Sequence, residues 1–178
     1  MSMEHKAFVF EYEAFELEVK EILETALVLN DVEGLEKFII LNIDYLTDPY
    51  EGDLLPENWV EMLEYNDPHE YGDFALTKFY NPTEDIGLGY EWFEVEELIS
   101  SQSREIISIL GDKIGKEDNY FDPEKMGSYF QSLNTILDNK NKIDVFMKSQ
   151  PEQTDLLNLV SCMFNSAISS KKGLYITF

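Results

Sequence analysis

Residues 71–99 read YGDFALTKFYNPTEDIGLGYEWFEVEELI, and we expect the rest of the chain to pack around this stretch. Aromatic side chains bring large buried areas and specific packing geometry, so they seed cores and interfaces. Gly87 and Gly89 predict a sharp turn between two packed segments, because glycine adopts backbone angles that other residues resist. The aromatic residues and the acids of the stretch are Tyr71, Phe74, Phe79, Tyr80, Tyr90, Trp92 and Phe93, with Asp73, Glu84, Asp85, Glu91, Glu94, Glu96 and Glu97.

The composition predicts a single folded domain over residues 1–178. Hydrophobic residues make up 44% of the chain and aromatic residues 13%, which argues against disorder despite a net charge of −23. No apolar run approaches the roughly 18 residues of a membrane span, and the first residues do not have the pattern of a signal peptide. The single cysteine, Cys162, excludes an internal disulfide and favours a cytoplasmic location.

The negative charge is concentrated in the first half of the sequence. Residues 1–100 contain 26 acids and four bases, whereas residues 101–178 contain ten acids and nine bases. Such asymmetry indicates a charged partner, and a basic protein fits it. Direct binding to nucleic acid is not expected, because phosphate contacts need a basic patch. The alternative is that these acids only solvate the outer faces of helices.

Periodicity in the first half predicts mainly helices. Apolar spacing predicts a short strand or extended entry over 7–12, a helix over 13–29 and a second helix from Asp31 to about Tyr45. A loop over 47–57 precedes a short helix over 57–65. The residues FALTKFY, 74–80, fit a helical turn or a strand equally well. A helix is expected from Trp92, with helical spacing extending or restarting it as far as Gly111.

The second half shows clearer start and stop signals. Asp122 followed by Pro123 predicts a helix to about Asp138, with Met126, Phe130, Leu133 and Leu137 as its core stripe. Residues 139–150 are expected to form a loop or a short helix. Pro151 opens a final long helix that Gly173 ends, and alternation over 174–178 predicts a C-terminal strand. The predicted fold class is therefore α+β, a mainly helical domain with a few short strands.

The weak candidates for catalysis are His69, Glu70 and Asp73. A loop that gathers a histidine and carboxylates can bind a divalent metal or supply general acid–base chemistry. Their spacing matches no metal motif, so we predict no metal site, and the alternative is an exposed loop histidine. Cys162 fits a buried small hydrophobe better than a nucleophile. Because Gly87–Gly89 lacks the pattern of a phosphate loop, no cofactor is expected.

Aromatic residues interleaved with acids are typical of interaction surfaces. Tyrosine and tryptophan anchor interfaces, and neighbouring acids steer a basic partner by long-range attraction. The alternative is an aromatic core under an acidic skin. The residues predicted to bind are Tyr80, Tyr90, Glu91, Trp92, Glu94 and Glu97.

In composition, acidic and rich in aromatic residues, the chain resembles the immunity proteins with which bacteria neutralise nuclease toxins. The resemblance rests on no motif and transfers no residue role. It implies a non-enzymatic inhibitor that masks a basic protein surface. Two alternatives stay open: a small-ligand pocket under the Gly87 turn, and a metal-dependent or acid–base enzyme centred on His69.

Overall fold

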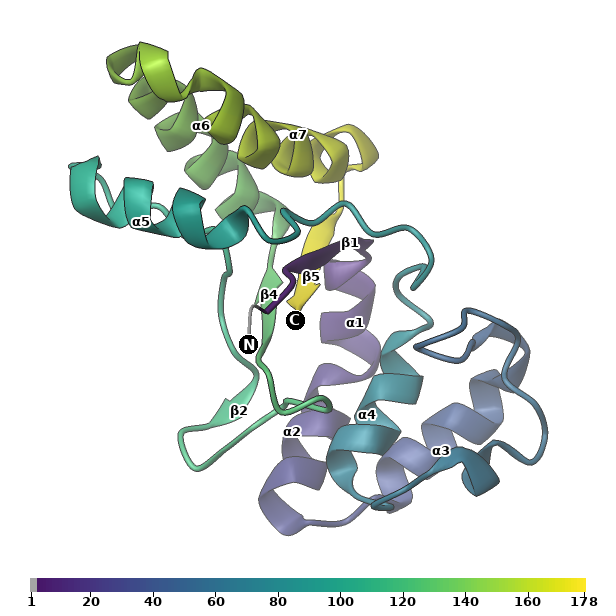
Figure 1. The fold of residues 1–178 in the computed structure, drawn as a ribbon. Helices are drawn as coiled ribbons and strands as arrows, with labels where there is room; N and C mark the ends of the chain where they lie inside the picture. The colour runs from purple at the N-terminus through teal and green to yellow at the C-terminus, as the bar shows by residue number, and fades with distance from the viewer. Residues whose placement is uncertain (1–2) are drawn as a thin grey trace.

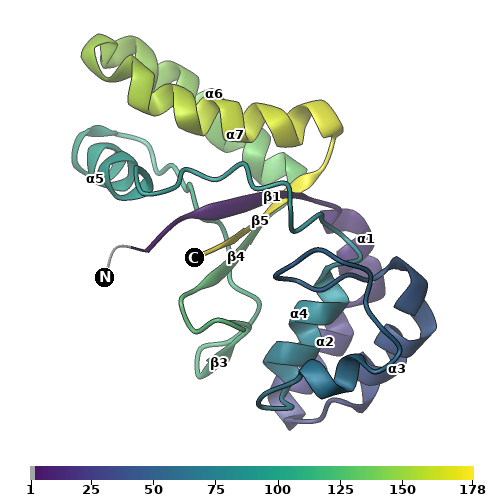
Figure 2. The same ribbon diagram turned by 45° about the vertical axis from the view of Figure 1, so that its right-hand side comes forward.

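The computed structural model describes residues 3–178 and has an α+β fold in which a small antiparallel sheet lies between two groups of helices (Figures 1 and 2). Helices α1 to α4 lie on one side of the sheet and α5 to α7 on the other. The bounds are α1 (Tyr12–Glu18), α2 (Lys20–Leu29), α3 (Glu33–Asn42), α4 (Pro68–Leu76), α5 (Trp92–Gln102), α6 (Leu133–Ser149) and α7 (Thr154–Ser170). The predicted fold class is confirmed.

The predicted C-terminal strand is confirmed, and it forms the centre of the sheet. β5 (Gly173–Thr177) pairs with β1 (Lys6–Phe10) on one side and with β4 (Ser128–Gln131) on the other, both antiparallel. Every residue of β5 is buried. Because β1 and β5 are antiparallel, Lys6 lies opposite Thr177, which brings residues from the two ends of the chain together. A separate two-stranded ribbon consists of β2 (Gly115–Lys116) and β3 (Asn119–Tyr120).

The sheet separates two hydrophobic cores, because side chains alternate between the two faces of a strand. One face carries Phe8, Phe10 and Tyr175 into the core under α1 to α4. The other carries Ala7 and Ile176 into the core under α5 to α7. The alternating residues Phe8 and Phe10 therefore mark the face of β1 that meets the acidic half of the chain.

The helices of the first half agree with the prediction in outline. The helix expected over 13–29 is broken at Val19, where φ is −129°, into α1 and α2. The second predicted helix is α3, which continues as a 3₁₀ turn over Ile43–Tyr45. The short helix predicted over 57–65 is a 3₁₀ turn over Trp59–Met62.

The helix predicted over 122–138 is wrong. The Asp122 carboxylate accepts hydrogen bonds from the backbone N–H groups of Met126 and Gly127, which closes a turn instead of a helix. Gly127 has a φ of 113°, and the chain then enters β4, where Phe130 is buried. Helix α6 begins only at Leu133, with the Ser132 side chain as its N-cap, and it includes most of the residues expected to form a loop.

Two further boundaries differ from the prediction. Helix α5 ends at Gln102, where Ser103 is extended, so the apolar residues up to Gly111 are irregular and not helical. The undecided segment 74–80 is helical in its first part, because α4 runs to Leu76.

The predicted turn at Gly87–Gly89 packs against the edge of β1. His5 and Gly89 exchange backbone hydrogen bonds of 3.0 Å, and Ile86 N–H donates to the carbonyl of Ala7. A Cβ on Gly87 would lie 2.2 Å from the carbonyl oxygen of His5, so only glycine allows this close approach. This packing leaves no space for a ligand between the turn and the strand at Gly87.

Candidate functional site

Helix α4 carries all three residues that the sequence offered for catalysis. Asp67 caps it by accepting hydrogen bonds from the backbone N–H groups of His69 and Glu70, at 2.9 and 3.0 Å. Pro68 occupies the first turn, where a missing N–H costs nothing. His69, Glu70 and Asp73 therefore lie on a helix and not in an exposed loop, and the expectation of an exposed loop histidine is wrong.

His69 has both ring nitrogens in structural hydrogen bonds. Nδ1 accepts from the backbone N–H of Asp122 at 3.1 Å, so the ring proton is on Nε2, which lies 3.1 Å from Oδ1 of Asn119. The ring also stacks on Phe121 at a centroid distance of 6.3 Å. His69 thus joins α4 to the segment that follows the β2–β3 ribbon, and neither nitrogen is free for acid–base chemistry.

Glu70 organises the loop that precedes its own helix. Its carboxylate accepts hydrogen bonds from the backbone N–H groups of Glu64, Tyr65 and Asn66, at 2.6 to 2.8 Å. These bonds hold the carboxylate at the start of α4. The contacts of His69 and of Glu70 therefore involve separate groups, and neither includes the carboxyl of Asp73.

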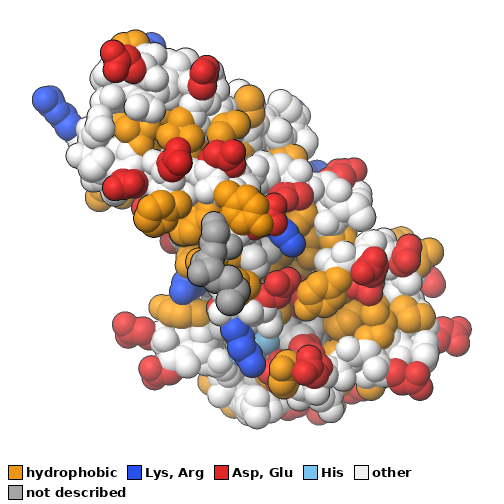
Figure 3. All heavy atoms as spheres, in the orientation of Figure 1, with side chains coloured by type: hydrophobic (Ala, Val, Ile, Leu, Met, Phe, Trp, Pro, Cys, Tyr) orange, Lys and Arg blue, Asp and Glu red, His pale blue; other side chains and the backbone are white. Residues whose placement is uncertain are grey.

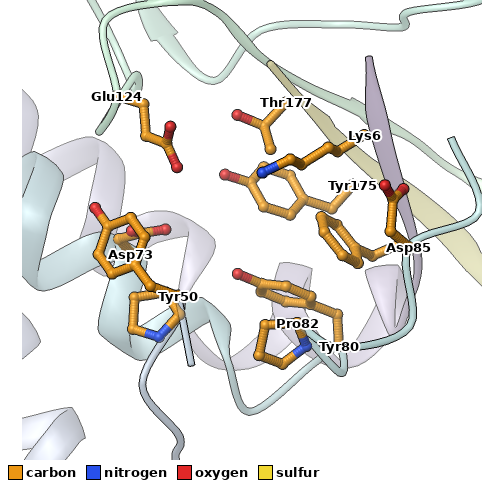
Figure 4. A pocket seen from close by; sticks show the side chains of 11 residues that line it. Lys6, Tyr50, Asp73, Tyr80, Pro82, Asp85, Glu124, Tyr175 and Thr177 are labelled. Atoms are coloured by element: carbon orange, nitrogen blue, oxygen red, sulfur yellow. The ribbon is translucent and has the colours of Figure 1, made fainter. Parts of the chain in front are cut away.

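Asp73 instead lines a cavity of about 210 Å³, here called the Asp73 pocket. Figure 4 shows Asp73 and Tyr50 facing Tyr175 and Lys6 across the pocket, with Glu124 at one end and Tyr80 at the other. These residues come from α4, β1, β5 and three loops. The full lining is Lys6, Phe8, Pro49, Tyr50, Asp73, Tyr80, Pro82, Asp85, Glu124, Tyr175 and Thr177.

The Asp73 carboxyl is buried without a hydrogen-bond donor from residues 3–178. The residue is 5% exposed, and none of the hydrogen bonds or ion pairs among the described residues involves its side chain. Burial, reinforced by the negative charges of Glu124, Asp48 and Glu70, raises the pKa of Asp73 from 3.8 to about 8. At neutral pH this carboxyl is therefore mostly protonated.

The tyrosine hydroxyls of the pocket are held in the same dry environment. Burial, followed by the charge of Asp73, raises the pKa of Tyr80 and of Tyr175 well above the ordinary value. Tyr50 is exposed as a residue, but it lines the pocket, and burial also raises its pKa. The Tyr175 hydroxyl lies 3.4 Å from Ser128 Oγ.

The pocket is lined by three carboxyl groups and one base. Asp85 is already engaged, because its Oδ1 accepts from the backbone N–H groups of Ala7 and Gly87 at 3.0 and 2.8 Å. Burial raises the pKa of Glu124, and the nearby positive charge of Lys6 lowers it less. Lys6 forms no ion pair with the described residues. One lysine therefore faces two carboxyl groups, Asp73 and Glu124, that have no partner.

The residues predicted to bind fall into two groups. Tyr90, Glu91, Glu94 and Glu97 are exposed at the start and along the outer face of α5. Trp92 is half-buried: its ring packs on Phe178 at 4.8 Å and its Nε1–H donates to the carbonyl of Met3. Tyr80 lies apart from them in the Asp73 pocket.

Lys6, Glu124 and Tyr175 were not predicted as site residues from the sequence. They lie far apart in the chain, and only the pairing of β1 with β5 and the turn at Asp122 place them together. Cys162 was expected to be buried and is exposed. No group of three or more histidine, cysteine or acidic side chains with the geometry of a metal site occurs within residues 3–178.

Comparisons with models of protein families, with curated proteins and with solved structures found no match. None of the helices in the described part of the chain has both the length and the apolar character that crossing a bilayer requires.

Proposed function

We propose that this protein binds a basic protein and masks part of its surface, acting as a non-enzymatic inhibitor in the cytoplasm. The observation that carries the proposal is the loop between α3 and α4, residues 43–65, here called the acidic loop. It contains seven acids and no lysine or arginine. It also exposes several aromatic and apolar side chains, and Pro49 and Tyr50 from this loop line the Asp73 pocket.

The acidic loop exposes its tyrosines while its tryptophan holds it in place. Tyr45, Tyr50 and Tyr65 are 72%, 64% and 59% exposed. Trp59 is buried and packs edge-to-face on Tyr71 at 5.3 Å. The aromatic residues of this region thus divide into one buried ring that anchors the loop and three exposed rings.

Hydrogen bonds fix the backbone of the acidic loop. The N–H of Leu55 donates to the carbonyl of Leu46 at 2.9 Å, and the N–H of Asp48 donates to the carbonyl of Asp53 at 2.8 Å. The N–H of Thr47 donates to Oγ1 of Thr77 beyond α4. A loop that is already ordered loses less entropy on binding, which favours affinity.

Charge and ring chemistry both suit a basic partner. Figure 3 shows acidic and apolar side chains intermixed over the part of the molecule where α2 to α4 and the acidic loop lie in Figure 1. Unpaired surface acids accelerate association with a basic protein, and tyrosines supply anchor contacts. Within the protein itself, Lys125 Nζ lies 4.5 Å from the ring centroid of Tyr65, so a loop tyrosine already accommodates an ammonium group.

The exposed face of α5 is a second candidate surface. It carries Tyr90, Glu91, Glu94 and Glu97, together with Phe93, which is 62% exposed. Helix α5 packs on the opposite side of the sheet from α1 to α4. The two surfaces can therefore be tested separately.

The test compares two triple variants with equal loss of charge. One replaces Glu51, Asp53 and Glu57 in the acidic loop, and the other replaces Glu91, Glu94 and Glu97 on α5, each with the matching amide. A partner captured by the wild type from its host is identified, purified and used to measure association rates over a range of salt concentrations. We expect the loop variant to associate more slowly and with a shallower salt dependence, since exposed charges act through screened attraction.

The results for the two triple variants distinguish the acidic loop from the face of α5 as the interface. If only the α5 variant is slow, the interface is on α5 and the acidic loop is excluded. If no purified basic protein binds the wild type, or if binding is indifferent to salt and to both variants, the proposed function is wrong.

A further inference from the structure

The Asp73 pocket has an arrangement that packing alone does not explain. A nearly buried carboxyl without a donor from the protein costs free energy, because its contact with water is reduced and no protein hydrogen bond compensates for it. The Asp73 carboxyl is directed into an open cavity and not into a packed core. Such a group is suited to a partner that arrives from outside.

We propose that the Asp73 pocket binds one guanidinium or ammonium group, with Asp73 as its counter-charge and Tyr50, Tyr80 and Tyr175 as its walls. The assignment of this group to an arginine or lysine side chain of the basic partner rests on the proposed function. The binding of a cation in the pocket does not depend on the proposed function.

The charge of the pocket selects a cation. Within residues 3–178, Asp73 and Glu124 have no hydrogen-bond or ion-pair partner, and Lys6 is the only basic side chain in the lining. An anion would meet three carboxyl groups and one lysine, whereas a cation stabilises the carboxylate form of Asp73. A hydrogen-bonded ion pair in a dry site is stronger than one in water, so a cation gains most beside the buried Asp73.

The aromatic rings and the tyrosine hydroxyls of the pocket also favour an organic cation. Tyr80 and Tyr175 meet at a centroid distance of 5.2 Å, and Phe8 lies 5.0 Å from Tyr80, which gives the pocket an aromatic wall. Organic cations are attracted to such rings, and tyrosine hydroxyls accept hydrogen bonds from N–H donors.

The size of the pocket limits the ligand to a small head group. Its volume of about 210 Å³ is below the range of roughly 300 to 1,000 Å³ that accommodates drug-sized ligands. A guanidinium or ammonium group at the end of an alkyl chain needs less space. Pro49 and Tyr50, both of the acidic loop, line the pocket, so a protein bound to this loop would lie next to it.

Binding is coupled to release of a proton. In the free protein Asp73 holds a proton at neutral pH, and a cation stabilises the carboxylate, so the proton passes to the solvent as the cation binds. The titratable groups that face Asp73 are Lys6, Tyr50, Tyr80, Asp85, Glu124 and Tyr175 in the pocket, with Asp48 and Glu70 beyond it.

The experiment titrates the wild type with methylguanidinium chloride and with butylammonium chloride, with sodium chloride at equal ionic strength as the reference. Calorimetry in two buffers of different ionisation enthalpy counts the protons released, and NMR shifts locate the site. The first variant is Asp73→Asn, which keeps the shape of the side chain and removes its charge. The control is Glu152→Gln, which removes an exposed charge in the connection between α6 and α7. Tyr80→Phe removes one pocket hydroxyl and serves as a second variant.

We expect saturable binding in the wild type and in Glu152→Gln, with release of up to one proton near neutral pH. Asp73→Asn should bind at least about tenfold more weakly and release no proton. Equal binding by wild type and folded Asp73→Asn, or no saturable binding by the wild type, overturns the proposal.

A final experiment tests whether the cation that fills the pocket is a side chain of the protein partner. Methylguanidinium should slow association with the purified partner in the wild type and not in Asp73→Asn. If methylguanidinium fills the pocket and the partner binds unaffected, the assignment to a partner side chain is wrong. If a basic partner binds but no cation enters the pocket, the proposed function stands and this inference fails.

Discussion

The rings of Tyr80 and Tyr175 meet edge-to-face with their centroids 5.2 Å apart. Tyr80 follows α4, and Tyr175 is at the middle of the central strand, where it lies opposite Phe8 and Phe130. This contact joins the helices of the acidic half to the sheet, and it gives the Asp73 pocket its wall. Both hydroxyls are buried near Asp73, whose charge adds to the rise in the pKa of each tyrosine.

Replacing Asp73 with asparagine should stabilise the folded protein. The folded state holds a carboxyl whose pKa is raised from 3.8 to about 8, so at pH 7 the unfolded chain gains free energy by ionising it. Each pKa unit is worth about 1.4 kcal/mol, and pH 7 lies about three units above the ordinary pKa of 3.8, so the expected gain at pH 7 is of order 4 kcal/mol. Urea unfolding measures it.

Glu152→Gln is the control for the loss of one acid. Its charge is exposed, so its free energy of unfolding should stay within about 0.5 kcal/mol of the wild type. A destabilised Asp73→Asn would show that the carboxylate makes favourable contacts and that its burial has been misread.

The pH dependence of stability should show two opposing slopes. The raised pKa of Asp73 means that the folded state binds a proton which the unfolded chain has lost, so stability falls as pH rises from about 4 to about 8. Burial lowers the pKa of His5 from 6.5 to about 4, so stability falls as pH drops through that window. We therefore expect a decline between about pH 6.5 and 8, and a flat region below it.

Thermal melts of the wild type and of Asp73→Asn across this range check the prediction. The stability of Asp73→Asn should not decline between about pH 6.5 and 8. Below pH 6.5 its stability should fall on acidification, because the effect of His5 is no longer offset by that of Asp73. Parallel profiles for the two proteins would rule out Asp73 as the source of the slope.

Replacing His69 with alanine should destabilise the fold. The change removes a bond to the backbone N–H of Asp122 and another to Asn119, and it removes a ring stacked on Phe121. Lost hydrogen bonds of this kind cost about 1 to 2 kcal/mol. Amide hydrogen exchange at Asp122, together with urea unfolding, measures the effect, and an unchanged exchange rate at Asp122 would contradict it.

The sequence predicts the parts of this fold whose signals are local. The long apolar stripe of α7 and the alternation of β5 are read from neighbouring residues and are confirmed. The region 122–138 is different, because Phe130, Leu133 and Leu137 are spaced as in a helix although Phe130 is in a strand. Two residues decide the structure of this region: Gly127, with its φ of 113°, and Ser132, which caps α6. Their local signals compete with the helical spacing of the apolar residues.

The candidate site was less accessible to prediction. Asp73 was considered only because it follows His69 closely, and Tyr80 only because it lies among other aromatic residues. Lys6 and Tyr175 come to the pocket through strand pairing, which brings together residues at opposite ends of the chain. Burial, which makes Asp73 unusual among 36 acids, depends on the whole fold and leaves no mark in its own sequence neighbourhood.

The proposed cation site is tested most directly by titrating the Asp73 side-chain carboxyl by ¹³C NMR, with and without methylguanidinium. We expect the pKa of Asp73 in the free protein to be about 8, and a saturating cation to lower it because the cation stabilises the carboxylate. If the pKa of Asp73 is near its ordinary 3.8 in the free protein, or if methylguanidinium leaves it unchanged, Asp73 is not the counter-charge of a cation site.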